Sequence, residues 1–415
     1  MTVAAQRRTR RVRPPSPSRS AAIQAAASEN HASVVELAQR LVRTPSRAGL
    51  DPYGPILELI GSWLTGHGLA ARRLHDAAGE LVGLACDVRG AHPGPRYVLD
   101  ACVDTPPFGD LAAWHYPPTS GVIEDGWLYG RGSSDCKTAV AIYCHIAARL
   151  NRRSDELHGT VTLLFDADEH TGGFNGAKQY FTGQDAPTNV AGVMIGYPGL
   201  RRIVIGGRGF LRAEVVTHGT AGHTGAGDPG DGNAVGKAAQ LVHELDHHRQ
   251  PAPTDPAFGL PPKLTVTAVH GGEGYSIVPD RCVVNVDVRL TPTFAQPAAT
   301  ALLERVVAEV DRQRPSAAAT TITYAESWPA FRLRDDSPIA VALGLASQRH
   351  TEQPPEWKVA GPSNIGNYLA SLGIDATAGF GVAYRNLHGT DECIEVATIP
   401  VVQAVYHEAV VALLS

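Results

Sequence analysis

The sequence lacks the features that mark a membrane-spanning or a disulfide-linked protein. No run of about 18 apolar residues occurs, which argues against a transmembrane helix and against a membrane partner. The six cysteines show no CxxC spacing, and no apolar stretch of signal-peptide length stands near the start. These absences predict a cytoplasmic protein with reduced cysteines.

The chain as a whole also has no excess of basic over acidic residues. Its 36 lysines and arginines stand against 41 aspartates and glutamates, and this mildly acidic balance argues against nucleic acid as the main partner. Hydrophobic residues make up 43% of the chain, so a large core can be buried. Because 415 residues exceed the usual size of one domain, we expect two or three compact units.

The first thirty residues differ in composition from the rest. They hold six arginines, several prolines and a single acid, Glu29. This composition predicts a disordered basic tail over residues 1–30, with a nucleic-acid or membrane-binding arm as the alternative. Ser33 followed by Glu36 is a capping box, so we expect the first helix of the folded part to start there.

Strand-like and helix-like segments alternate in the next part of the chain. The apolar runs at 97–104, 160–168 and 192–197 have the length of buried strands, and 138–150 has helical length and composition. This alternation predicts an α/β catalytic domain, with a mainly parallel sheet covered by helices on both faces. We expect its first part at residues 31–206 and its second part at 327–415.

The pattern changes from about residue 207. The expected elements alternate in the order βαββαβ, over 210–217, 233–248, 263–270, 282–290, 297–312 and 320–325. This order is typical of a ferredoxin-like α+β sandwich, which can bury one face of a small sheet under two helices. We therefore predict an inserted lid domain over residues 207–326.

Polar residues follow several of the predicted strands in the catalytic domain. Asp104 ends the first strand, Asp135 lies in the segment GRGSSDCK, and Glu169 lies in DEHTGG after the next strand. His388 follows later, in NLHGTDE. Ligands bind beyond the carboxyl ends of parallel strands, so these side chains can converge on one bivalent metal ion. A single aspartate in such a place is more often a helix cap.

The motifs around these residues resemble those of a known enzyme family. The segments VLDACVD and EDGWLYGRGSSDCK are similar to the HxD and DG.LYGRGxxDxK signature of the co-catalytic zinc amidohydrolases. That family contains aminoacylase, acetylornithine deacetylase, succinyl-diaminopimelate desuccinylase and glutamate carboxypeptidase. The resemblance continues through DEHTGG, GTAGHT and HGTDE, in the family's order, from about residue 33 to the end.

The resemblance implies roles for the catalytic residues. Asp104 resembles the acid that orients a metal-bound ligand, and Asp135 the carboxylate that bridges two metals. Glu169 resembles the general base, and His388 a terminal metal ligand. The implied reaction is hydrolysis of an amide bond in an N-acyl amino acid or a small peptide-like substrate, by a metal-activated water whose proton Glu169 accepts.

The resemblance also implies roles for the lid. His223 resembles the residue that stabilises the oxyanion, often from a partner subunit, which implies a homodimer formed through the lid. Arg289 resembles the arginine that holds a substrate carboxylate; pairing with a lid acid is the alternative. Ser276 replaces a family asparagine, and Asn364 stands where many relatives carry an acid. Both can contact substrate, or serve as a solvated turn residue and a helix cap.

Three metal-ligand positions depart from the family pattern. Cys102 stands in place of the first metal's histidine, Tyr197 in place of its acid, and His170 in place of the second metal's glutamate. Cys102 can bind as a thiolate, but Tyr197 is a poor zinc ligand because a phenol titrates near pH 10. Asp135, His170 and His388 remain as a three-ligand set with an open position for water.

The metal content and the reaction stay open at this stage. We favour one occupied zinc site over two, with a metal-free site as a further alternative. The same three ligands also form the facial triad of non-haem iron enzymes, so another bivalent metal and a reaction other than hydrolysis are alternatives. The altered ligands also suit a non-hydrolytic or metal-free relative with a binding or specialised biosynthetic role.

Overall fold

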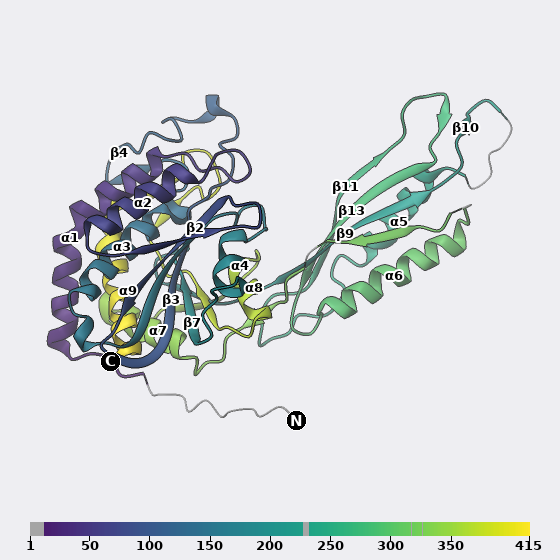
Figure 1. Ribbon diagram of the computed structural model, residues 1–415. Coiled ribbons are helices and arrows are strands. Elements are labelled where there is room, and N and C mark those ends of the chain that lie inside the picture. Colours follow the sequence, from purple (N-terminus) through teal and green to yellow (C-terminus); the bar gives the residue numbers. More distant parts are fainter. Residues whose placement is uncertain (1–11, 227–231, 317, 326) are drawn as a thin grey trace. The chain divides into compact units, whose positions relative to one another are not determined.

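The computed structural model describes residues 12–226, 232–316, 318–325 and 327–415. The chain forms two compact units, drawn in Figure 1. The first unit comprises Met1–Ile205, Leu333–Lys358 and Gly373–Ser415, and the second comprises Gly206–Arg332 and Val359–Leu372. The second unit therefore begins and ends near the expected lid, but it also includes Val359–Leu372, which we had placed in the catalytic domain.

A long sheet forms the centre of the first unit. Strands β6, β3, β7 and β17 run parallel to one another at its centre. Strands β2 and β8 are antiparallel to this central group, β1 is antiparallel to β2, and β15 is antiparallel to β8. The order is β1-β2-β6-β3-β7-β17-β8-β15, with β16 beside β8. The bounds are β1 (Ala71–His75), β2 (Leu81–Arg89), β3 (His92–Cys102), β6 (His158–Asp166), β7 (Val190–Ile195), β8 (Arg202–Gly207), β15 (Phe331–Arg332), β16 (Glu356–Ala360) and β17 (Ala376–Ala378). The predicted α/β class is confirmed.

Helices pack on both sides of this sheet. They are α1 (Pro17–Arg43), α2 (Gly54–Gly66), α3 (Thr138–Asn151), α4 (Asn175–Thr182), α7 (Pro338–Thr351) and α9 (Ile399–Leu414). Figure 1 shows α1, α3 and α9 on one side of the strands and α4 on the other. Short helical turns cover Leu111–Ala113, Ser154–Glu156 and Val396–Thr398, and the turn η2 covers Ser133–Lys137.

The helix α1 corrects the expectation for the start of the chain. It begins at Pro17, where the side chain of the N-cap Ser16 accepts a hydrogen bond from the backbone of Arg19. The predicted disordered tail is thus wrong for residues 17–30, as is a helix start at Ser33; residues 1–11 lie outside the described part. Ile23, Ala26 and Ala27 are buried, and α1 packs on α9. This contact joins distant parts of the chain, so composition did not reveal it.

The helix α9 is the most apolar of the described helices. One window of described residues, Val396–Leu414, is long and apolar enough to cross a membrane, and 78% of it is buried inside the protein. The helix packs against α7, α1 and α3, and Glu408 on it accepts hydrogen bonds from Arg349 and His350. We interpret α9 as a core helix.

A second small sheet joins two loops of the first unit. Its order is β18-β19-β5-β4, with β4 (Ile123–Glu124), β5 (Trp127–Tyr129), β18 (Tyr384–Arg385) and β19 (Cys393–Glu395). All its pairings are antiparallel, and Cys393 lies opposite Tyr129. This pairing brings the segment after residue 129 close to the segment before residue 393.

The second unit has the predicted βαββαβ order. Its antiparallel sheet runs β11-β13-β9-β14, and α5 and α6 share one core with it. The bounds are β9 (Gly209–His218), α5 (Ala234–His247), β11 (Lys263–Gly271), β13 (Arg281–Leu290), α6 (Gln296–Gln313) and β14 (Thr321–Tyr324). A short ladder pairs β10 (Gly222–His223) with β12 (Ile277–Val278). The inserted α+β domain is confirmed.

The helix α8 (Ile365–Ser371) explains why Val359–Leu372 belongs to the second unit. The side-chain amide of Asn367 donates hydrogen bonds to the backbone carbonyls of Arg208 and Pro329, at 3.1 and 2.7 Å. These contacts tie the segment to both ends of the inserted domain. They lie far apart in sequence, so the hydrophobic pattern alone could not place them.

Candidate metal centre

The parallel strands bring the predicted catalytic residues to one edge of the sheet. Strand β3 lies between β6 and β7, and the carboxyl ends of the three strands meet at that edge. The Asp104 carboxylate follows β3 and accepts hydrogen bonds from the backbone nitrogens of Glu169 and His170, at 3.1 and 2.9 Å. Asp104 thereby holds the segment that carries the candidate base.

Asp135, His170 and His388 form one cluster. One ligand atom from each of them can be chosen so that all three lie within 4.8 Å of one another. Nε2 of His388 lies 2.9 Å from Oδ2 of Asp135, and Nε2 of His170 lies 3.6 Å from the same oxygen. The structure therefore brings together the three residues predicted to hold a metal ion.

The imidazole of His170 is prepared for a ligand. Its Nδ1 lies 3.2 Å from Oδ2 of Asp104, whereas its buried Nε2 has no hydrogen-bond partner among the described residues. A carboxylate on one ring nitrogen holds the proton there and leaves the other nitrogen free to bind a metal. The donor set of two imidazoles and one carboxylate fits a zinc ion.

Charge around His170 also favours a cation. Burial alone would lower the pKa of His170, but hydrogen bonding and negative charge from Asp104 and Asp135 outweigh it and raise the pKa to about 11. Burial likewise opposes ionisation of Asp135, yet its contacts with His170 and His388 hold the pKa well below the usual range. The pocket thus stabilises positive charge at its centre.

Glu169 has the environment of a general base. Its side chain is 13% exposed, and Oε1 accepts a hydrogen bond of 2.8 Å from the Tyr197 hydroxyl. Burial, together with the charges of Asp135 and Asp104, raises the pKa of Glu169 to about 7. A carboxylate with a pKa near neutrality can both accept and return a proton.

The two replaced ligands of the first metal position differ in their surroundings. Tyr197 donates its hydroxyl hydrogen to Glu169, and burial raises the pKa of the phenol well above its usual value. Cys102 is 3% exposed, and its Sγ lies 3.7 Å from Oδ1 of Asp135. Cys136, which sequence reasoning did not select, lies beside Cys102 and Asp135, with Sγ 2.7 Å from the same oxygen.

A buried ion pair, also not selected from the sequence, connects the loops that carry Asp135 and His388. Arg131 lies 2.7 Å from Oε2 of Glu392 and donates to the backbone carbonyl of His388 at 3.1 Å. Oε1 of Glu392 accepts hydrogen bonds from the backbone and the hydroxyl of Ser134, at 3.0 and 2.6 Å. Arg131 lies in the motif GRGSSDCK and Glu392 in HGTDE, and this was the sequence feature that could have pointed to them.

Removing the Glu392 carboxylate should destabilise the protein strongly. Arg131 and Glu392 are 3% and 0% exposed, so Glu392→Ala leaves a buried guanidinium without its partner. We expect the free energy of unfolding to fall by about 3–5 kcal/mol, measured by denaturant titration. The exposed Glu36 on α1 provides the control, since Glu36→Ala should change it by less than about 0.5 kcal/mol. Equal effects of the two variants would contradict this role.

Arg289 lies in the second unit with another arginine nearby. Its Nε is 2.7 Å from Oδ1 of Asp287, and Nη1 donates to the Ser363 hydroxyl at 3.4 Å. The pairing with Asp287 is the alternative that the sequence left open for Arg289. Burial and the charge of Arg289 lower the pKa of Arg208, so two guanidinium groups share this region of the second unit.

The other predicted lid residues have local roles in the structure. His223 in β10 is exposed, and its Nδ1 accepts a hydrogen bond from the backbone of Gly225 at 3.0 Å. Ser276 is exposed, and its carbonyl oxygen accepts from the backbone of Thr224 at 3.0 Å. Asn364 caps α8, as its alternative interpretation predicted, with its side chain accepting from the backbone of Gly366 at 2.8 Å.

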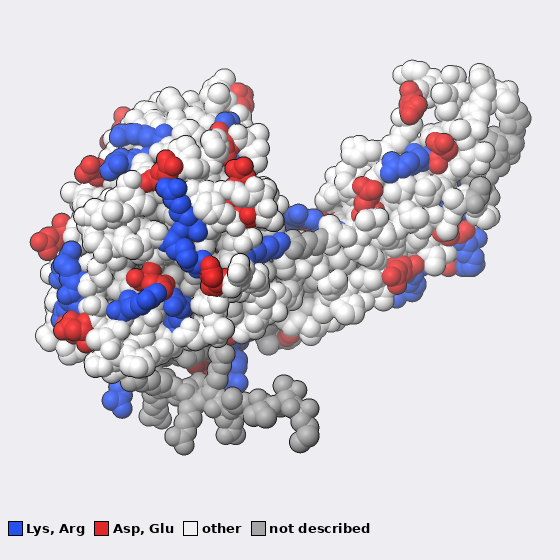
Figure 2. All heavy atoms as spheres, viewed as in Figure 1, with Lys and Arg blue, Asp and Glu red and all other residues white. Residues whose placement is uncertain are grey.

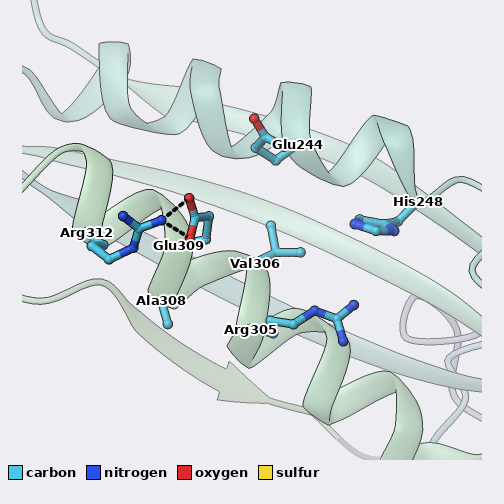
Figure 3. A pocket seen from close by; sticks show the side chains of 7 residues that line it. All are labelled: Glu244, His248, Arg305, Val306, Ala308, Glu309 and Arg312. Carbon is cyan, nitrogen blue, oxygen red and sulfur yellow. Dashed lines mark hydrogen bonds and ion pairs between the residues drawn. The ribbon is translucent and has the colours of Figure 1, made fainter.

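Charged side chains also lie on the surface and in a hollow of the second unit. Basic and acidic side chains are interspersed over the described surface that Figure 2 shows. A hollow on α5 and α6 of the second unit is lined by Glu244, His248, Arg305, Val306, Ala308, Glu309 and Arg312 (Figure 3). Glu309 and Arg312 pair with each other there.

Sequence comparison identifies relatives over most of the chain. The sequence model described as peptidase family M20/M25/M40 matches residues 99–412. The chain is 27% identical, over 384 residues, to a succinyl-diaminopimelate desuccinylase of Rhodospirillum centenum, covering 90% of this chain and 95% of the relative. It is 26% identical to the enzyme of that name from Marinobacter nauticus, covering 92% of this chain and 98% of the relative.

Structural comparison agrees on the fold. An M20 family metallo-carboxypeptidase of Sulfolobus solfataricus superposes with a TM-score of 0.73 at 18% identity, covering 92% of this chain and 98% of the other. A protein of Bacillus subtilis described as a dinuclear metal-binding peptidase of the M20 family gives 0.67 at 16% identity, covering 92% and 98%. The chain therefore belongs to peptidase family M20/M25/M40, whose members are metal-dependent hydrolases of carbon–nitrogen bonds.

Proposed function

We propose that this protein hydrolyses the amide bond of an N-acyl amino acid or a small peptide-like substrate. The observation that carries the proposal is the convergence of Asp135, His170 and His388 beside Glu169. A metal-ligand set next to a carboxylate of raised pKa is what hydrolysis by an activated water requires. The succinyl-diaminopimelate desuccinylases among the relatives agree with an N-acyl amino acid as substrate.

The residues of the chain divide the work of the reaction. A bound bivalent metal supplies polarisation of the amide carbonyl and acidifies a water molecule. Glu169 accepts the proton of the attacking water and returns it to the leaving amine. The hydrogen bond from Tyr197 to Oε1 orients this carboxylate, and Oε2 lies 3.4 Å from Nδ1 of His170. Asp104 holds the backbone of Glu169 and the ring of His170 in place.

We assign zinc to the position formed by Asp135, His170 and His388. Two imidazoles and one carboxylate leave a fourth position open, as in catalytic zinc sites. Iron binds the same ligand types, so metal analysis decides between the two ions. The short distances of 2.9 and 3.6 Å from Asp135 Oδ2 to the imidazole nitrogens support binding of a single ion by all three side chains.

A carboxylate on the substrate would be held in the second unit. The Arg289 guanidinium is 27% exposed, and the positive charge of Arg208 adds to its own. A planar guanidinium can bind a carboxylate through two parallel hydrogen bonds. Ser363 would hold the Arg289 guanidinium in place, because its hydroxyl accepts from Arg289 and donates to the backbone carbonyl of Arg208. The side-chain oxygen of Asn364 caps α8 instead.

A homodimer through the second unit belongs to the same proposal. His223 is exposed on β10 opposite Ile277 of β12, and several apolar side chains of the second unit are also exposed. These are Val269, Tyr275 and Ile277. A second copy would cover this apolar surface and give His223 a partner site to enter. We expect the enzyme to work in the cytoplasm, where its six free cysteines would stay reduced.

A metal-free relative with a binding role remains the second candidate. The observation in its favour is the raised pKa of His170, because an imidazolium between Asp104 and Asp135 could balance their charges without a metal. Such a protein would bind its ligand without cleaving it. The retained Glu169, with its pKa of about 7, has no task in that function.

Metal removal separates the two candidates. The protein is purified without chelator, its metal content is measured, and a panel of N-acyl amino acids and dipeptides is assayed before and after dialysis against a chelator. We expect hydrolysis to fall at least about a hundredfold after dialysis and to return with zinc, because loss of the Lewis acid costs several kcal/mol in the transition state. Hydrolysis at the same rate without metal, or none at any stage, would reject the proposal.

A further inference from the structure

Two buried cysteines lie near Oδ1 of Asp135, in the carboxylate of the proposed metal centre. The sulfur of Cys102 also lies within 4.8 Å of a ring nitrogen of His170. Cys102 ends β3, and Cys136 lies in η2 directly after Asp135. Their side chains come from different elements, 34 positions apart in sequence. We propose that Cys102, Cys136 and Asp135 form a second metal position, which binds a thiophilic bivalent ion such as zinc.

The two oxygens of Asp135 face different partners. Oδ2 lies 2.9 and 3.6 Å from the imidazole nitrogens of His388 and His170, whereas Oδ1 lies 2.7 and 3.7 Å from the sulfurs of Cys136 and Cys102. The carboxylate thus presents one oxygen to a pair of imidazoles and the other to a pair of thiols. The carboxylate can therefore bridge two ions, one bound to each oxygen.

The distances suit a small ion between the sulfurs and the oxygen. The three ligand atoms lie within 4.8 Å of one another. Zinc binds sulfur at about 2.3 Å and carboxylate oxygen at about 2.0–2.2 Å, so ligand atoms around one tetrahedral ion lie roughly 3.5–3.8 Å apart. The observed separations need shifts of an ångström or less to reach this geometry. All three residues are buried, with exposed fractions of 3%, 5% and 0% for Cys102, Asp135 and Cys136.

The chemistry of the ligands determines which ions would bind. Thiolates select soft or borderline ions such as zinc and cadmium over magnesium or calcium. Each S–H bond would break as a sulfur–metal bond forms, so binding of one bivalent ion releases two protons to solvent. No oxidant or reductant is needed. Together with the proposed histidine position, the centre would hold two ions of different ligand type bridged by Asp135.

The Cys136 thiol compensates for an acid that the family pattern has and this chain lacks. Tyr197 replaces that acid, but its hydroxyl is occupied by Glu169 and is directed to the base. Cys136 offers a third donor without drawing on Glu169 or Tyr197. The ligand lost at Tyr197 is thus replaced by the sulfur of Cys136, the residue after Asp135.

Metal stoichiometry and thiolate spectroscopy test this position. Protein dialysed to remove metal is titrated with Zn²⁺ for stoichiometry and with Co²⁺ or Cd²⁺ for absorption. We expect two equivalents per chain and a strong sulfur-to-metal charge-transfer band. Cys136→Ser should lose one equivalent and most of the band. Cys102→His, which supplies a nitrogen ligand, should keep two equivalents with a weaker band.

Matched variants make the outcome independent of the proposed function. Cys144→Ser changes an equally buried thiol of α3 and should keep both equivalents and the full band. His388→Ala should lose one equivalent and keep the band, because it removes a ligand of the histidine position only. One equivalent without a charge-transfer band in the unmodified protein would overturn the thiolate position and leave the histidine position intact. A band that survives Cys136→Ser would also overturn it.

Discussion

Glu169→Gln is expected to lower kcat for amide hydrolysis by about 10²- to 10⁴-fold, the usual contribution of a general base. The amide keeps the size of the side chain and can still contact Tyr197, but it cannot accept a proton from water. Metal content and KM should change little, since Glu169 contacts Tyr197 and His170 and is outside the three-residue ligand set. Steady-state kinetics and metal analysis of the same preparation measure both quantities.

The pH dependence gives this prediction a second readout. A base must be deprotonated to act, so kcat/KM should fall as the pH is lowered through the pKa of Glu169. The pKa of Glu169 is about 7 without a metal. The positive charge of a bound ion lowers this pKa, because it stabilises the carboxylate. The acid limb should therefore lie at or below about pH 7 and be absent from the residual activity of Glu169→Gln.

The neighbouring acid provides the control for Glu169. Asp168 is half-buried, and its carboxylate accepts a hydrogen bond from the Thr171 hydroxyl in the same loop. Its φ of 73° is a conformation that asparagine tolerates well, so Asp168→Asn should fold normally and keep its activity. An equal loss of kcat in Asp168→Asn and Glu169→Gln would show that loop geometry is responsible and would reject Glu169 as the base.

His170→Ala is expected to lose the metal of the histidine position and the activity with it. The variant leaves Asp135 and His388 as two ligands, too few for a stable catalytic zinc site. We expect kcat/KM to fall by at least about 10³-fold, which corresponds to about 4 kcal/mol. Zinc titration by competition with a chromophoric chelator measures the affinity, and the same substrate panel measures the rate.

Two further variants separate metal binding from a structural role of His170. His170→Glu installs the carboxylate that the family pattern has at this position, and it should retain zinc. His92→Ala removes an exposed imidazole at the opposite end of β3 from Cys102, and it should change neither zinc affinity nor rate. Full zinc content in His170→Ala would contradict the proposed ligand set, whatever the effect on activity.

The sequence was sufficient for the fold because its signals are local. Strand and helix periods along 97–197 and the βαββαβ order from residue 207 reflect burial within single elements. They predicted the sheet, the inserted domain and the strand ends that carry Asp104 and Glu169. The start of α1 was missed because arginines and prolines dominate the segment where it begins, whereas burial of Ile23, Ala26 and Ala27 depends on α9, at the other end of the chain.

By itself, the sequence determined most of the chemical groups of the site: a base, two imidazoles, carboxylates and the thiol of Cys102, at the ends of strands and in the loops beside them. Only the tertiary structure decided how these groups pair. The thiols of Cys102 and Cys136 share one oxygen of Asp135, Tyr197 holds Glu169, and Arg131 binds Glu392, 261 positions away. Such pairings depend on distances across the packed core, and a packed core places side chains to within fractions of an ångström that no local pattern encodes.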